Sequence, residues 1–328
     1  MRAVGVKAFG GPDVLEMMDV ATPEPRPGEA LVKIAFAGVN FLDIYMRRGE
    51  YGVAAGTPPL PRILGREGAG QVVAVGTGVT DVKPGDRVAW CVSEASYAEF
   101  AAVPAWRLVR VPDDVPLDLA CALQLQGATA HYLATATFPL KAGDVALVHS
   151  GAGGVGQILI QLAKALGAKV IATVGSEAKV AIARARGADH VIVTGKEDFL
   201  PQVLELTGRG CDVVYDAVGR DTIARSIAAC RRRGLVALYG ASSGAVEAID
   251  PLVLAGAGSI FFTRPHLADY MQDAAEIGAR ANDLFTLLKD GRLKIAVDRV
   301  FSLDAAREAH AALESRATTG KLLLKVSA

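Results

Sequence analysis

The spacing of apolar and polar positions changes part-way along the chain. Up to about residue 115, short apolar runs lie between clusters of Pro and Gly, as at 30–36, 71–75 and 87–90. Short runs between turn residues are typical of β-strands, so this part predicts an all-β region, either a small barrel or a partly open sheet. A helical stretch begins at Asp118, and after Lys141 apolar strands alternate with amphipathic helices.

The alternating part predicts a doubly wound parallel sheet. Its six apolar strands are expected at 145–149, 169–174, 190–193, 212–215, 235–239 and 259–263. Four helices join the first five strands, near 155–166, 177–186, 199–206 and 222–231. Near-continuous apolar strands joined by crossover helices are typical of a parallel sheet that is covered on both faces.

The last part of the chain follows a different order. It predicts a long helix at about 267–290, a strand near 295–301, a helix at 304–313 and a last strand at 321–326. This order does not extend a doubly wound sheet, so we expect the chain to return to the β-rich part. The prediction is therefore a β-rich domain made of 1–123 and 266–328, with a second domain, 124–265, inserted in it.

A glycine-rich loop separates the first strand of the parallel sheet from the helix after it. Gly151, Gly153 and Gly156 satisfy the pattern G-x-G-x-x-G. The first glycine of such a loop allows the tight turn, the second lets a pyrophosphate approach the backbone, and the third lets the helix pack closely on the sheet. Glycine-rich turns also occur for packing alone, but the strand before this loop and the amphipathic helix after it favour dinucleotide binding.

The end of the second strand bears on which dinucleotide binds. An NAD site normally places a carboxylate there, which accepts hydrogen bonds from the ribose 2′-hydroxyl. This chain has Gly175 and Ser176, followed by Glu177 and, a turn later, Lys179. A hydroxyl and a lysine suit a 2′-phosphate, so NADPH is predicted. The alternative is that Ser176 only caps the next helix and that Lys179 is solvated.

Composition narrows the classes of protein to consider. The 328 residues include 35 basic and 35 acidic side chains, and this zero net charge makes nucleic acid an unlikely main partner. No apolar stretch reaches the roughly 18 residues that a membrane helix needs. The four cysteines are scattered and form no CxxC pair, which indicates reduced cysteines, no metal site and a cytoplasmic protein.

Six longer motifs occur in order along nearly the whole chain. They are 38–49 (GVNFLDIYMRRG), 64–70 (LGREGAG), 82–88 (VKPGDRV), the glycine loop 151–156, 214–219 (VYDAVG) and 314–320 (ESRATTG). Together they resemble the zinc-free quinone oxidoreductases of the medium-chain dehydrogenase/reductase superfamily, which include zeta-crystallin. Zinc-dependent relatives would have a Cys in place of Asn40, a His in place of Arg66 and a four-cysteine lobe after Trp90, and this chain has none of these.

The resemblance implies a fold and an activity. The fold is α/β, with a GroES-like β-rich catalytic domain and a Rossmann domain, and the activity is transfer of hydride from NADPH to a quinone without zinc. The residues implied near the nicotinamide are Asn40, Phe41, Asp43 and Tyr45, with Thr129 opposite. Those implied along the rest of the cofactor are Ala152, Gly153, Gly154, Val155, Ser176, Lys179, Thr194, Val218, Gly240, Ala241, Ser242, Phe262, Thr263, Arg264 and Arg316.

Several of these residues also have a simpler interpretation. Asn40 could be a turn residue, Asp43 a helix cap and Tyr45 an ordinary residue of an amphipathic helix. Arg66 and Glu67 are expected to form a structural ion pair at the former metal position. Position 194 departs from the family, because many members have an Asn-Tyr pair after the third strand. Thr194 keeps a possible phosphate contact but loses any stacking contact.

Two other functions stay open. The same nicotinamide geometry serves a zinc-free NADPH-dependent reductase of enone or alkenal double bonds, and some relatives are catalytically idle NADPH-binding proteins with structural or RNA-associated roles. The resemblance also implies a homodimer, because relatives pair through the sixth Rossmann strand, here Ser259 to Thr263. The proton that completes quinone reduction is expected from Tyr45 or from solvent.

Overall fold

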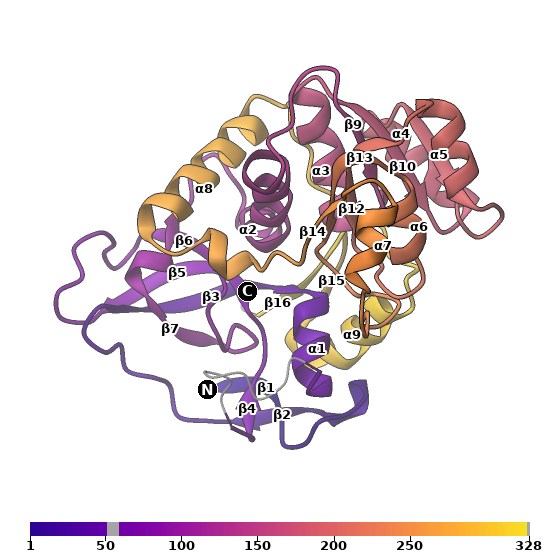
Figure 1. Cartoon of the computed structure of the whole chain (residues 1–328). Helices are drawn as coiled ribbons and strands as arrows, with labels where there is room; N and C mark the ends of the chain where they lie inside the picture. Colours follow the sequence, from indigo (N-terminus) through magenta and orange to yellow (C-terminus); the bar gives the residue numbers. More distant parts are fainter. Residues whose placement is uncertain (51–58, 327–328) are drawn as a thin grey trace. The chain divides into compact units, whose positions relative to one another are not determined.

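A computed structural model describes residues 1–50 and 59–326 (Figure 1). The chain divides into two compact units. The first contains Met1–Leu125, Met271–Thr286 and Ile295–Ala328, and the second contains Gln126–Tyr270 and Leu287–Lys294. The helices α2 (Leu117–Tyr132) and α8 (Ala274–Lys289) contribute residues to both units.

The first unit is built around β-sheets. One sheet has the strand order β2-β1-β4, and the other has the order β15-β16-β3-β5-β6-β8, with β7 also paired to β3. Its strands are β1 (Arg2–Val6), β2 (Leu15–Asp19), β3 (Glu29–Val39), β4 (Arg62–Ile63), β5 (Glu67–Val75), β6 (Arg87–Cys91), β7 (Phe100–Pro104), β8 (Val109–Arg110), β15 (Val297–Ser302) and β16 (Lys321–Lys325). Its helices and helical turns include η1 (Pro12–Val14), α1 (Phe41–Arg48), η2 (Ala105–Arg107), η6 (Leu303–Ala305) and α9 (Ala306–Glu314).

The last strand of the chain joins the middle of the larger sheet. β16 pairs antiparallel with β3, with Leu322 opposite Val39. β5 pairs antiparallel with β3 on its other side, with Gly68 opposite Ala37. The starts of β16 and β5 therefore both lie beside the end of β3, and three segments that are far apart in the sequence meet next to Asn40.

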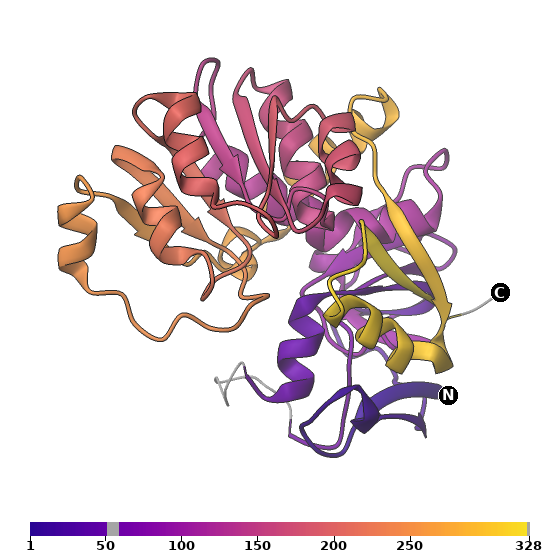
Figure 2. The same ribbon diagram turned by 90° about the vertical axis from the view of Figure 1, so that its right-hand side faces the viewer.

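The second unit contains the predicted six-stranded parallel sheet. The strand order is β11-β10-β9-β12-β13-β14, and it reverses between β9 and β12. Figures 1 and 2 show the ribbon of this unit in two views. The strands are β9 (Val145–Val148), β10 (Lys169–Val174), β11 (His190–Val193), β12 (Cys211–Asp216), β13 (Cys230–Leu238) and β14 (Phe261–Thr263). The helical segments are η3 (Leu133–Thr137), α3 (Gly154–Ala165), η4 (Glu177–Lys179), α4 (Val180–Ala185), α5 (Phe199–Thr207), α6 (Ile223–Ala228), α7 (Pro251–Gly256) and η5 (Leu267–Tyr270). Ligands of such sheets bind at the carboxyl ends of the strands where the order reverses.

Several predicted elements differ from those observed, and the helix expected at 177–186 is divided into η4 and α4. β13 begins at Cys230 rather than at 235, because its first residues pair beside Cys211 before a register shift, and their three arginines interrupt the apolar run. The long helix expected at 267–290 is divided into η5 and α8. Asp273 accepts a hydrogen bond from the Glu276 backbone N–H at 2.9 Å, so a new capped helix starts here.

Candidate functional site

The glycine loop connects β9 to α3 at the point where the strand order reverses. Gly151 donates its backbone N–H to Thr173 O at 2.8 Å, which ties the loop to β10. A Cβ atom at Gly156 would collide with the Ser150 carbonyl, so only glycine allows α3 to pack this closely. Gly153 is the N-cap of α3 and has no side chain that could cap it. The first turn of α3 therefore leaves its N–H groups for an anion, which fits a cofactor pyrophosphate.

The next two strand ends lie side by side. Thr194, after β11, donates its backbone N–H to Val174 O of β10 at 2.9 Å, and its hydroxyl contacts the same oxygen at 3.3 Å. Ser176 is exposed and precedes η4, and its side chain makes no capping hydrogen bond there. The alternative interpretation of Ser176 as a helix cap thus has no support, and the structure brings Ser176 and Thr194 to one edge of the sheet.

A buried carboxylate, which the sequence analysis did not single out, organises the end of β12. Asp216 Oδ1 accepts hydrogen bonds from the backbone N–H groups of Val218 and Gly219, at 2.8 and 3.0 Å. Its other oxygen, Oδ2, accepts hydrogen bonds from the hydroxyl groups of Thr222 and Ser226. Asp216 therefore fixes the loop that carries the predicted cofactor residue Val218. Its only signal in the sequence is its place in the 214–219 motif.

The loop after β13 lies against this one. Gly240 and Ser242 donate their backbone N–H groups to Asp216 O and Ala217 O, at 3.3 and 3.2 Å. A Cβ atom at Gly240 would approach the Ala217 carbonyl too closely, so this position needs glycine. The predicted cofactor residues 240–242 are thus held next to Val218.

His149 follows β9, and its ring connects β10 with the helix α6. Its Nδ1 lies 2.9 Å from the Thr173 hydroxyl and its Nε2 lies 3.1 Å from the Ser226 hydroxyl. Because Ser226 donates to Asp216 at 2.7 Å, it must accept a hydrogen bond from Nε2–H, and Nδ1 then accepts from Thr173. Burial lowers the pKa of His149, against the opposing charge of Asp216, so the ring is neutral. The histidine is therefore structural.

A second cluster lies in the first unit, where β3, β5 and β16 meet. The Asn40 amide donates to Glu67 Oε2 at 2.9 Å and accepts from Lys321 Nζ at 2.6 Å. Lys321 and Glu67 form an ion pair, and both side chains are fully buried. Glu67 Oε1 also accepts the Leu125 backbone N–H at 2.6 Å. Sequence reasoning missed Lys321, although the 314–320 motif ends at the residue before it, because the sequence does not show that β16 pairs with β3 beside Asn40.

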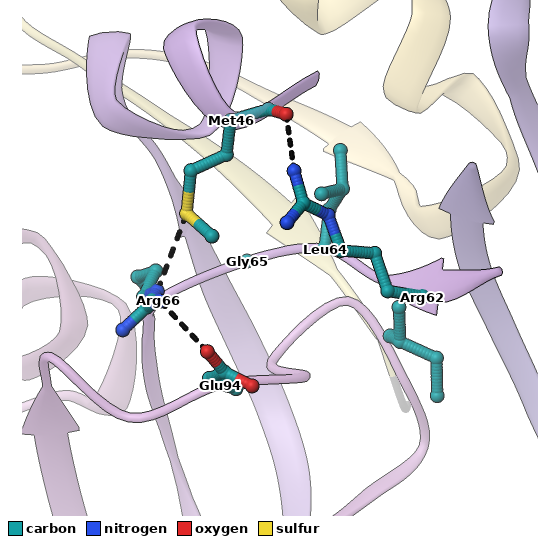
Figure 3. Close-up of a pocket in the computed structure, with 7 residues that line it drawn as sticks. Met46, Arg62, Leu64, Gly65, Arg66 and Glu94 are labelled. Atoms are coloured by element: carbon teal, nitrogen blue, oxygen red, sulfur yellow. Dashed lines mark hydrogen bonds and ion pairs between the residues drawn. The ribbon is translucent and has the colours of Figure 1, made fainter. Parts of the chain in front are cut away.

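The predicted ion pair between Arg66 and Glu67 is wrong. Arg66 instead binds Glu94 at 2.7 Å, with its Nε against the Met46 sulfur at 3.3 Å (Figure 3). Successive residues of an extended segment point to opposite sides, so two neighbours rarely pair with each other. Glu67 points inward to Lys321, whereas Arg66 points to the small pocket shown in Figure 3. There Arg62 donates to the Met46 carbonyl, so both arginines contact the last turn of α1.

The helix α1 carries the predicted residues that follow Asn40. Phe41 and Tyr45 are partly exposed on one face of the helix, with ring centroids 6.1 Å apart. Asp43 is fully buried, and its Oδ2 accepts the Asn40 backbone N–H at 2.9 Å. The structure thus gives Asp43 the capping role considered as its alternative, and a role in catalysis stays a prediction. Burial raises the pKa of Asp43 to about 7.

A chain of hydrogen bonds leads from Arg47 through His310 and Tyr97 to Asp43. Arg47 contacts His310 Nδ1 at 3.1 Å, His310 Nε2 contacts the Tyr97 hydroxyl at 3.1 Å, and that hydroxyl contacts Asp43 Oδ2 at 3.2 Å. Arginine only donates, so Nδ1 accepts and Nε2 carries the hydrogen. Tyr97 then donates to Asp43. All the donors in the chain therefore point toward one carboxylate.

The remaining predicted residues are distributed over both units. Thr129 is buried on α2, and Ala152 is buried in the glycine loop. Phe262 and Thr263 belong to β14, and Arg264 follows that strand. Arg316 lies in the first unit just after α9, with a positive φ of 57°. The cofactor roles of these residues stay predictions.

Gln126 is a further candidate that sequence reasoning missed. A Cβ atom at Gly154 would collide with its side-chain amide, so Gln126 lies against the start of α3.

Over residues 1–50 and 59–326, no cluster of His, Cys, Asp and Glu is arranged to hold a metal ion. Within the same ranges, no helix has the length and apolar character needed to span a bilayer.

Comparison with known proteins places this geometry in context. Family models described as "Alcohol dehydrogenase GroES-like domain" and "Zinc-binding dehydrogenase" match residues 26–113 and 154–276. A quinone oxidoreductase of Pseudomonas aeruginosa is 41% identical over 325 residues, which cover 98% of this chain and 99% of that protein. A 2-haloacrylate reductase of a Burkholderia species is 40% identical over 330 residues, which cover 99% and 98%.

Solved structures agree with these matches. The Escherichia coli quinone oxidoreductase complexed with NADPH has a TM-score of 0.95 and 38% identity, and the match covers 99% of this chain and 100% of that one. A quinone oxidoreductase of Pseudomonas syringae has a TM-score of 0.96 and 41% identity, with 99% of each chain covered. The predicted combination of a GroES-like domain with a Rossmann sheet is confirmed.

Proposed function

Because this chain belongs to the quinone oxidoreductases of the medium-chain dehydrogenase/reductase superfamily, we propose that it is an NADPH-dependent quinone reductase. The observation that carries the proposal is the uncapped glycine loop at the point where the strand order reverses. When bound, NADPH supplies the hydride that reduces the quinone. A quinone accepts hydride readily because its ring delocalises the resulting negative charge.

The second unit would hold most of the cofactor. Gly153 and the first turn of α3 would bind the pyrophosphate, and Ser176, Lys179 and Thr194 would bind the 2′-phosphate. Asp216 fixes the segments at Val218 and 240–242, which would hold the nicotinamide ribose. The proposal also assigns cofactor contacts to Thr129, Phe262, Thr263, Arg264 and Arg316, and places Asn40, Phe41 and Tyr45 near the reacting ring.

The donor set around Asn40 does not suit a zinc ion. Asn40 stands where zinc-dependent relatives have a cysteine, and Arg66 stands where they have a histidine. The Lys321 ammonium already touches both Asn40 Oδ1 and Glu67, so a further cation would meet a positive charge. We therefore assign no metal to the reaction.

A second candidate function is reduction of an activated carbon–carbon double bond. The Burkholderia 2-haloacrylate reductase favours it, because that protein matches this chain about as well as the quinone oxidoreductases do and its name describes such a reaction. Both reactions need a hydride delivered from the nicotinamide to an electron-poor acceptor.

We further expect a homodimer and a cytoplasmic location. β14 is the edge strand of its sheet, and Phe261 on it is 63% exposed, which suits pairing with a second copy. The four cysteines are all free and buried, as is usual in a reducing compartment.

A paired cofactor titration followed by an acceptor panel tests the function. We expect binding of NADPH in preference to NADH, and faster oxidation of NADPH with quinones than with enones, alkenals or haloacrylates. A clear preference for double-bond acceptors would move the assignment to the second candidate. Binding of NADPH with no turnover of any acceptor would indicate an idle NADPH-binding protein, and a preference for NADH would overturn the cofactor assignment.

Replacement of Tyr45 by Phe tests the proton donor. Tyr45 is partly exposed beside Phe41, and a positioned proton donor typically contributes about 100-fold to the rate. We expect kcat for quinone reduction to fall by about that factor, with the KM for NADPH unchanged. Tyr270→Phe removes a hydroxyl that bonds to Thr137 instead and serves as the control. An unchanged kcat across the pH range would assign the proton to solvent.

A further inference from the structure

The ends of β10 and β11 continue side by side beyond the sheet. Val174 pairs with Val193 as the last register position, and Thr194 donates its backbone N–H to Val174 O. A Cβ atom at Gly195 would lie only 2.7 Å from Gly175 O, so the two backbones nearly touch there. Residues 194–196 therefore run alongside 174–176, where the predicted site for the 2′-phosphate lies.

Lys196 is the next residue, and it reaches across to the neighbouring segment. Its Nζ binds Glu177 Oε1 at 3.0 Å, and the two side chains are 62% and 61% exposed. Glu177 is the first residue of η4 and directly follows Ser176. The Lys196 ammonium is thus held at the first residue of η4, next in the chain to Ser176.

Glu177 presents a problem for a 2′-phosphate at this edge. Its carboxylate would repel a phosphate bound beside Ser176, and NAD-specific sites use such a carboxylate to bind the ribose hydroxyl. Lys196 cancels that charge. The Lys196 ammonium has three N–H donors, so it can remain beside Glu177 and also form a charge-assisted bond to a phosphate.

We propose that Lys196 is a specificity-determining residue, which neutralises Glu177 and binds the 2′-phosphate of NADPH. This inference rests on the proposed function and extends it. It assigns the preference for NADPH over NADH to a residue in the segment that follows β11. Lys196 then supplies part of the affinity that an aromatic residue at position 194 would otherwise give.

The test compares Lys196→Met with a matched control on the same two strands. Lys164 on α3 binds Asp189 at 2.8 Å, and Asp189 precedes β11 at the opposite, amino end of β10 and β11. Lys164→Met therefore removes another Lys–carboxylate ion pair, which lies at the amino end of the strands and away from the carboxyl edge. Dissociation constants for NADPH, NADH, 2′,5′-ADP and 5′-AMP are measured by titration, so the readout does not depend on turnover.

We expect Lys196→Met to raise the dissociation constants for NADPH and 2′,5′-ADP by about tenfold, which corresponds to the loss of one charge-assisted hydrogen bond. The dissociation constants for NADH and 5′-AMP should not change. Lys164→Met should leave all four constants unchanged. In Lys196→Met/Glu177→Gln, loss of the repelling carboxylate should restore part of the NADPH affinity. Equal weakening of NADPH and NADH, or no change in either, would overturn the proposal. Wild-type protein that binds no nucleotide would instead overturn the proposed function itself.

Discussion

Replacement of Lys321 by Met should destabilise the protein by about 3–5 kcal/mol, the usual cost of removing one partner from a buried ion pair. Lys321 and Glu67 are both fully buried, so the Glu67 carboxylate would be left without its counter-charge. Asn40 Oδ1 would lose its 2.6 Å donor at the same time. Water cannot replace either contact without opening the junction of β3, β5 and β16.

Denaturant unfolding at neutral pH measures this loss. Lys325→Met changes an exposed lysine at the other end of the same strand, and it should alter the free energy of unfolding by no more than about 0.5 kcal/mol. The double variant Lys321→Met/Glu67→Gln removes both charges, and we expect it to be more stable than Lys321→Met alone. Equal stability of Lys321→Met and Lys325→Met would mean that the buried pair contributes nothing to folding.

The cofactor loop could be predicted because its signals are local. Gly151, Gly153 and Gly156 form a recognisable pattern within six residues, and the strand before them and the helix after them each show their own apolar pattern. The parallel sheet follows from the same apolar patterns. The start of β13 was missed because pairing with β12, and not its own apolar pattern, extends it over three arginines.

The polar clusters could not be predicted because their members are distant in the sequence. Lys321 lies 254 positions from Glu67 and 281 from Asn40, and only the return of β16 to β3 brings them together. Reasoning from the sequence alone paired Arg66 with its neighbour Glu67, whereas the partner of Arg66 is Glu94 on another loop. Periodicity along the sequence indicates helices and strands, but it does not indicate which charged side chains pair. These contacts are therefore decided by the tertiary structure.

Lowering the pH should reduce the difference in the free energy of unfolding between the wild type and the variant His310→Gln. Burial, followed by the charge of Arg47, lowers the pKa of His310 to about 3. The unfolded chain has a histidine pKa of about 6.5, so the folded state binds fewer protons than the unfolded state between pH 3 and 6.5. The stability contributed by neutral His310 is thus complete above pH 6.5 and is lost as the pH falls toward 3.

Asp43, at the other end of the same chain of hydrogen bonds, works in the opposite direction. Its pKa is raised to about 7 by burial, so the folded state holds a proton that the unfolded state releases near pH 3.9. Protonation of Asp43 therefore stabilises the folded state increasingly as the pH falls from 7 to 4. In the wild type this gain offsets the stability that is lost through His310. The wild-type profile alone therefore does not isolate His310.

The difference between the two proteins does isolate it, because both keep Asp43. At pH 7.5, His310→Gln should be the less stable protein, since it loses the bonds to Arg47 and Tyr97. From pH 7.5 to 4.5 we expect that deficit to shrink by about 2–3 kcal/mol, measured by denaturant unfolding at each pH. A constant deficit for His310→Gln would mean that the native state accepts a proton on His310 without cost, and the donor order from Arg47 to Asp43 would then have to be abandoned.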